Sequence, residues 1–91
     1  MATRAGRTPV EEVARRGEEI YHRAIRPTLS EDHRGKAVAI DIHSGDFVIG
    51  KNTLDTVPAL RARHPDAEIW CRRIGFRTYH WHHGRAEQEP I

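Results

Sequence analysis

The regular pattern of this chain begins with apolar residues at helical spacing. Between Val10 and Ala24 they recur every three or four positions, and charged side chains occupy the positions between them. Thr8-Pro9 has the composition of a helix start, and Arg26-Pro27 has that of a helix end. The pattern therefore predicts a helix between these two points. Gly17 weakens a helix, and its presence here indicates close packing against another element.

The period changes to two in the most apolar stretch of the chain, from Lys36 to Gly50. Val38, Ile40 and Ile42 fall on one face of the expected strand, and small alanines fall on the other. Residues 43–46, His-Ser-Gly-Asp, have turn composition, so the stretch predicts a β-hairpin. We expect helices to cover the face with the larger side chains, and something to pack closely against the alanines.

The remaining pattern predicts one more helix and further strands. Residues 52–64 carry a narrow apolar stripe of Leu54, Val57 and Leu60, which predicts a helix. Residues 68–74 predict a third strand, and residues 76–82 predict a fourth strand or a continuation of the third beyond Gly75. The order α-β-β-α-β-β predicts an α+β domain with a small antiparallel or mixed sheet of three to four strands and two helices on one face.

Length and composition set the scale of this domain. Ninety-one residues suffice for one domain, with a thin core because 37% of the residues are hydrophobic and 31% are charged. We expect that domain to span residues 8–84, between a disordered basic tail at residues 1–7 and a C-terminal tail at residues 85–91. So small a core also leads us to expect a protein partner or self-association.

Cysteine content and charge indicate the surroundings of the protein. The single cysteine, Cys71, forms no internal disulfide and favours a reducing compartment. The N-terminus has no apolar leader, and no apolar run is long enough to span a bilayer, so we expect a cytoplasmic protein without membrane contact. The net charge of +2 gives only weak support to nucleic-acid binding.

Histidines near the C-terminus provide one candidate site. His80 and His82 alternate on the fourth predicted strand and therefore point to the same side, where they could share a zinc ion. Cys71, His43 or Asp46 could supply a third ligand. The alternative is a solvated edge strand, which the lack of any paired-cysteine or helical histidine motif favours.

Arginines and aromatic residues alternate in the last strands and provide a second candidate site. Such a face can bind a protein partner or stack and clamp single-stranded nucleic acid. The residues of this candidate binding face are Arg72, Arg73, Arg77, Tyr79 and Trp81. Against that interpretation, the neighbouring apolar residues Ile69, Trp70 and Ile74 are needed to build the core.

Acids, a histidine and a serine gather at the hairpin turn, from Asp41 to Asp46. A hydrolytic interpretation would make Ser44 a nucleophile and His43 its base. Adjacent residues on a strand point to opposite faces, which suits that proton transfer poorly, and turn formation accounts for the same residues. Because no phosphate-binding glycine loop and no other catalytic motif is present, we expect a protein that is not an enzyme.

Four short segments of the sequence form a recognisable set of motifs: Gly35-Lys-Ala-Val-Ala-Ile-Asp41, Ser44-Gly45-Asp46, Pro65-Asp66-Ala67 and Arg73-Ile74-Gly75. With the helix segment Gly17 to Tyr21, they resemble a family of short uncharacterised bacterial proteins, a domain of unknown function. The resemblance covers roughly residues 17–80 and implies a compact α+β domain with no assigned catalytic residues. It also implies a product encoded beside other genes, so an antitoxin-like partner of a neighbouring gene product is expected.

These observations together predict a non-enzymatic protein-binding module, either a homodimer or the partner of another protein. Strands with open edges, such as residues 76–82, are where another chain could pair. Nucleic-acid binding through the arginine and aromatic residues, and zinc binding through the histidine cluster, are the alternatives.

Overall fold

The computed structural model describes residues 8–82 and 85–91, and for residues 77–82 and 85–87 it describes the backbone alone. Within these residues the fold is α+β, as the sequence predicts. Its α-helices are α1 (Val10–Ile20) and α2 (Thr53–Arg63). Its strands are β1 (Ala37–Asp41), β2 (Phe47–Gly50), β3 (Ile69–Arg73), β4 (Phe76–His82) and β5 (Arg85–Gln88). Short π- and 3-10-helical segments continue α1 toward β1, at Tyr21–Ile25, Arg26–Thr28 and Glu31–His33. The predicted basic tail, residues 1–7, lies outside the described residues.

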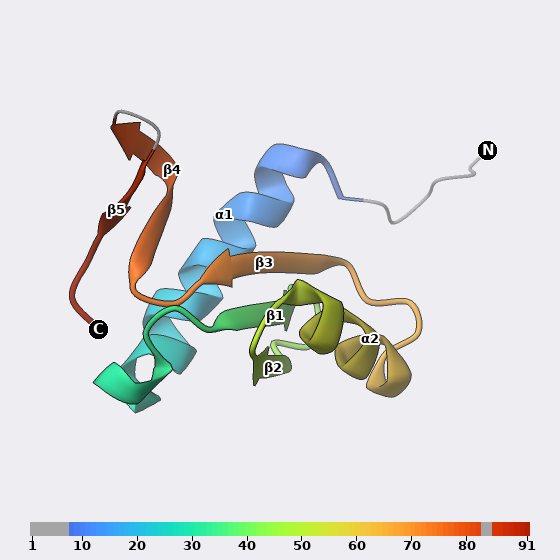
Figure 1. The fold of residues 1–91 in the computed structure, drawn as a ribbon. Coiled ribbons are helices and arrows are strands. Elements are labelled where there is room, and N and C mark those ends of the chain that lie inside the picture. Colours follow the sequence, from blue (N-terminus) through green and yellow to red (C-terminus); the bar gives the residue numbers. More distant parts are fainter. Residues whose placement is uncertain (1–7, 83–84) are drawn as a thin grey trace.

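The central sheet is antiparallel and has the strand order β2-β1-β3 (Figure 1). Ala39 lies opposite Val48 on β2 and opposite Cys71 on β3. The hairpin between β1 and β2 turns where its composition predicts, with Gly45 at a φ of 80°. The Gly45 N–H donates to the Asp41 carbonyl at 2.8 Å, which closes the turn.

The side chains of β1 alternate between the two faces of the sheet, as the period-two pattern predicts. Val38 and Ile40 have no exposed surface, and with Ile42 they form the core together with Ile20 and Tyr21. Because Ala37 and Ala39 lie on the other face, α2 packs there, with Thr56 against Gly50 and Leu60 fully buried. Within the predicted stripe of α2, Leu54 is 83% exposed and lies outside this contact.

The two helices cover opposite faces of the sheet, where the sequence predicted that both would cover one face. A Cβ on Gly17 would meet the indole of Trp70, so α1 packs on the face that carries Trp70. Gly50 contacts Thr56 of α2. Gly50 pairs with Ala37 of β1, and Trp70 pairs with Ile40 of β1. Ala37 and Ile40 are three residues apart on one strand and so point to opposite faces, which places α2 on the face opposite α1. Alternation alone could not reveal this, since it defines two faces without saying which helix covers each.

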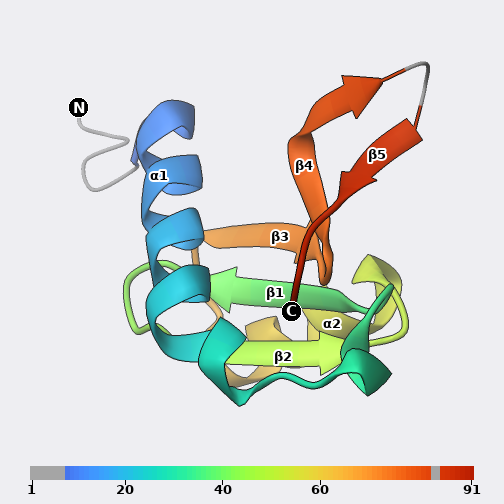
Figure 2. The ribbon, with the colours of Figure 1, turned by 90° about the vertical axis from the view of Figure 1, so that its left-hand side faces the viewer.

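The C-terminal residues form a hairpin of β4 and β5 that projects from the body of the protein (Figures 1 and 2). Residues 85–91, expected as a tail, thus supply β5 and then return to the body. The Glu89 N–H donates to the Gly75 carbonyl at 3.0 Å, and Ile91 packs against the core. The short polar segment of β5 carries no alternating pattern by which it could be predicted. None of the helices in the described ranges has the length and apolar character required to cross a bilayer.

Candidate functional site

Arg72, expected on an exposed binding face, lies inside the protein. Only 1% of its side chain is exposed, and its guanidinium carbon lies 4.1 Å from the centre of the Tyr21 ring. The guanidinium pairs with Glu18 of α1 at 3.5 Å and with Glu89, and it donates to the Phe76 carbonyl. These contacts tie the C-terminal segment to α1 and β3. A guanidinium enclosed in this way is not available to a nucleic acid or a protein surface.

The other residues of the predicted binding face are separated from Arg72. Arg73 is exposed at the end of β3, on the opposite face of the sheet. The side chains of Arg77, Tyr79 and Trp81 lie outside the described residues, although their backbone belongs to β4.

The side chains of the histidine cluster, His80 and His82, also lie outside the described residues. Of the third ligands expected for zinc, Cys71 is half-buried on β3, and burial raises the pKa of its thiol. Among the side chains that the structure describes, no three or more His, Cys, Asp or Glu are grouped so that they could hold a metal ion.

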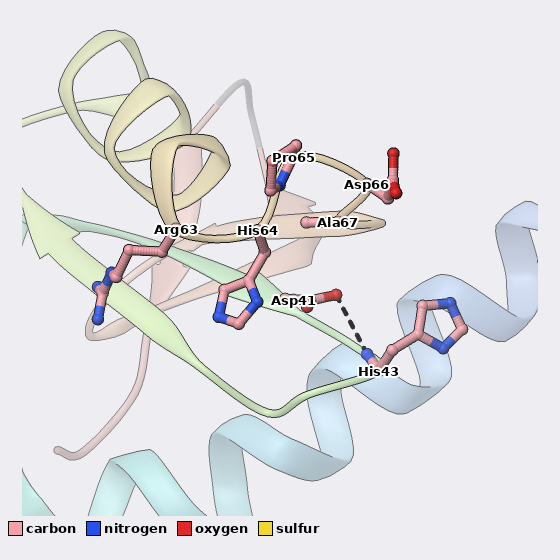
Figure 3. Close-up of a pocket in the computed structure, with 7 residues that line it drawn as sticks. All are labelled: Asp41, His43, Arg63, His64, Pro65, Asp66 and Ala67. Carbon is pink, nitrogen blue, oxygen red and sulfur yellow. Dashed lines mark hydrogen bonds between the residues drawn. The ribbon is translucent and has the colours of Figure 1, made fainter.

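The residues of the hairpin turn line an open cavity of about 410 Å³ with the end of α2 and the loop that follows it (Figure 3). Asp41 lies between His43 and His64 in this view. Each histidine pairs with a carboxylate: His43 Nε2 lies 2.6 Å from Glu68 Oε1, and His64 Nε2 lies 3.0 Å from Asp46 Oδ2. Arg63 and Asp66 complete the charged lining.

Hydrogen bonds hold the turn beside this cavity. The Ser44 hydroxyl donates to Asp41 Oδ2 at 2.8 Å, and not to the His43 ring that the hydrolytic interpretation would use as its base. Burial raises the pKa of Asp41, but hydrogen bonds from Ser44 and from backbone N–H groups outweigh burial and lower it. The hydrogen bond with His64 is the main cause of the lowered pKa of Asp46. The carboxylates of Asp41 and Asp46 therefore stay charged near neutral pH.

The outer edge of β3 is the second candidate site. The N–H of Ile42 donates to the Glu68 carbonyl, and the N–H of Ile74 donates to the Lys36 carbonyl. In an antiparallel ladder every second pair is hydrogen-bonded, so these two bonds fix which residues of β3 bond to β1. Trp70 and Arg72 therefore direct their backbone groups toward β1. Ile69, Cys71 and Arg73 direct theirs away from the sheet. Among the described residues, no hydrogen bond reaches these outward groups.

The opposite edge of the sheet, formed by β2, is protected at Phe47. The outward N–H of Phe47 donates to Asp46 Oδ1 at 2.9 Å. The outward carbonyl of Phe47 accepts from Arg63 Nη2 at 3.2 Å. Side chains of this kind hinder the addition of a strand at Phe47, whereas the outward groups of Ile49 have no hydrogen bond among the described residues. At β3, all three outward residues lack such protection in the part of the chain that the structure describes. The free edge of β3 therefore distinguishes it from β2.

Sequence reasoning expected an open edge at residues 76–82 and did not single out β3. In the structure, β4 pairs with β5 on one side, and its other edge has no strand partner among the described residues. The position of β3 at the side of the sheet depends on its pairing with β1, a long-range contact. The one sequence signal was Gly75, which has a φ of 85° and separates β3 from β4.

Comparison of this chain with protein-family models, with curated proteins and with solved structures finds no match. The resemblance to short bacterial proteins therefore stays a prediction, and the function is argued from the structure itself.

Proposed function

We propose that the protein is a non-enzymatic protein-binding module that accepts a strand from another chain at the outer edge of β3. The observation that supports this proposal is the row of outward backbone groups at Ile69, Cys71 and Arg73, with no hydrogen bond to them among the described residues. A strand added to a sheet edge gains its affinity from such main-chain groups. Side chains on alternate positions then select the partner.

Helix α1 supports the same surface from one side. In both ribbon views the N-terminal turns of α1 extend beyond β3, past the edge of the sheet (Figures 1 and 2). Val10, in the first of these turns, is 81% exposed, and Val13 is half-buried. A strand paired with β3 would lie beneath this part of α1 and cover apolar surface there. A protein encoded by a neighbouring gene and a second copy of the chain are the candidate occupants.

Proline at position 71 tests this surface, because it removes an outward N–H without removing a hydrogen bond from the ladder with β1. We would use the wild-type protein, Cys71→Pro and Cys71→Val as matched baits in native extract. Valine keeps the N–H and suits a strand, so it serves as the control. Proteins that bind this edge are retained by the wild type and by the valine variant, and lost from the proline variant. Partners retained equally by all three baits would contradict the proposal.

A further inference from the structure

We infer that the occupant of the β3 edge is a second copy of this chain, paired antiparallel about a two-fold axis at Cys71. This inference rests on the proposed function and names its partner. In such a dimer the sheets of the two copies join through β3 into one continuous sheet.

The register of the outward groups is self-complementary. Ile69 and Arg73 stand two residues to either side of Cys71, and all three direct their N–H and carbonyl groups outward. When the strand meets its own copy antiparallel, Cys71 faces Cys71 and Ile69 faces Arg73. Each outward N–H then meets an outward carbonyl, because all three are hydrogen-bonded pairs.

The side chains that would face each other across this axis are compatible. Arg73 is exposed and would lie opposite the half-buried Ile69, so no like charges meet in the cross-strand pairs. At the centre, two cysteine side chains are small and uncharged near neutral pH, since burial raises the pKa of Cys71. The aliphatic part of Arg73 can cover Ile69 while its guanidinium stays in water.

The partial protection of the β2 edge favours two copies over a longer assembly. A two-fold contact uses the same strand of both copies, so each β3 edge is consumed once. The outer edges of the joined sheet are then the β2 strands. Both backbone groups of Phe47 that point outward are already bonded, to Asp46 and to Arg63. The outward groups of Ile49 have no hydrogen bond among the described residues, so β2 offers one free residue where β3 offers three, and strand addition at β2 is the weaker contact.

The first helix adds to the contact. A two-fold axis perpendicular to the sheet places both α1 helices on the same face, running antiparallel to one another. The N-terminal turns of each helix already extend beyond β3 (Figure 2). They would lie over the joined strands, where Val10 loses its exposure to water. The contact thus combines a backbone ladder with an apolar layer, as a stable interface of a small domain requires.

Sedimentation equilibrium of the purified full chain over a dilution series tests this inference. We expect a monomer–dimer equilibrium for the wild type and for Cys71→Val. Cys71→Pro should weaken self-association by about tenfold or more, because symmetry removes the same N–H hydrogen bond twice. Circular dichroism and thermal melting establish that each variant is folded.

Amide hydrogen exchange of the wild type keeps the test decisive if the proline variant does not fold. The backbone N–H groups of Cys71 and Arg73 should gain protection as concentration rises, while that of Asp66, in the exposed loop before β3, should not. A short bifunctional thiol-reactive reagent should also cross-link two chains through Cys71.

The outcomes separate this inference from the proposed function. A chain that stays monomeric at all concentrations overturns the inference, and the capture experiment then decides the proposed function independently. A dimer that withstands Cys71→Pro and leaves the Cys71 and Arg73 amides unprotected places the interface elsewhere, and overturns the inference too. Concentration-dependent protection of these amides, with a dimer weakened by proline, supports both.

Discussion

Arg72 is the residue whose placement depends most on its neighbours. A buried charge is tolerated only when partners compensate for the water that it loses. Here Glu18 and Glu89 supply opposite charge, and the face of Tyr21 receives the guanidinium carbon at 4.1 Å. The three partners come from α1, from the segment that continues it and from the C-terminal end. One side chain therefore holds distant parts of the chain together.

Gly17 provides a test at this scale. Because a Cβ at position 17 would overlap the indole of Trp70, Gly17→Ala should force the ring or the helix to move. Overpacking of this kind costs about 1–3 kcal/mol, whereas alanine in place of glycine within a helix gains about 1 kcal/mol. We expect a net loss of unfolding free energy of up to about 2 kcal/mol in urea titrations.

The matched control is Glu19→Ala, on the exposed side of the same helix. It should change the free energy of unfolding by no more than about 0.5 kcal/mol. A Gly17→Ala protein more stable than the wild type would contradict the close contact with Trp70.

At the scale of elements, Glu68 connects three segments. It precedes β3, and its carboxylate accepts hydrogen bonds from Thr8, ahead of α1, through the hydroxyl at 2.6 Å and the N–H at 2.9 Å. His43, in the turn between β1 and β2, lies 2.6 Å away. The Thr8 hydroxyl, then the Thr8 N–H and then His43 lower the pKa of Glu68 to about 2. Thr8, expected at the start of the helix, thus connects the chain ahead of α1 to the residue before β3.

The lowered pKa of Glu68 predicts how stability depends on pH. The ordinary value is 4.5 and the folded value is about 2, so the folded protein binds this proton less readily than the unfolded chain. The resulting stability is present above about pH 4.5 and is lost as the pH falls toward 2. Melting temperatures measured between pH 6 and pH 2 should therefore fall less steeply for Glu68→Gln than for the wild type.

Some acid sensitivity should remain in this variant, because the pKa values of Asp41 and Asp46 are also lowered. Glu11→Gln, at an exposed position in the first turn of α1, is the control and should follow the wild-type curve. Parallel curves for wild type and Glu68→Gln would mean that the contacts with Thr8 and His43 are not formed in solution.

On the scale of the whole molecule, the two edges of the sheet differ in kind. One edge, at β2, has its outward backbone groups at Phe47 occupied by side chains. At the other edge, β3 has no such contacts within the described ranges. A sheet with one open edge can form a closed pair, whereas a sheet with two open edges can extend without limit. This difference between the edges is consistent with the proposed dimer through β3.

Removal of the Arg63 side chain should open the second edge. Arg63→Ala frees the Phe47 carbonyl while the Phe47 N–H stays bonded to Asp46, so with the unbonded groups of Ile49 the β2 edge becomes easier to extend. We expect species larger than a dimer to appear at high concentration in sedimentation velocity, where the wild type gives none. Arg23→Ala, an exposed arginine of the π-helical segment, is the matched control. An Arg63→Ala protein no larger than the wild type would contradict the protective role of Arg63.

Local pattern was sufficient where the determining contacts are close in sequence. The hairpin of β1 and β2 follows from alternation across Val38, Ile40 and Ile42, and from a turn whose Gly45 adopts a positive φ. The small side chains of Ala37 and Ala39 also indicated a closely packed second face, and α2 packs there. In each case the residue type itself limits the backbone or the space around it.

Tertiary structure alone decided which helix covers each face, where the charge of Arg72 is compensated and which edge of the sheet stays open. The alternation of β3 would permit Arg72 to face either solvent or the core, and only the arrival of Glu18 and Glu89 makes burial favourable. The openness of β3 likewise depends on β4 turning away to pair with β5. These features arise from segments far apart in the chain, whose meeting no local pattern encodes, and so the candidate binding surface emerged only from the fold.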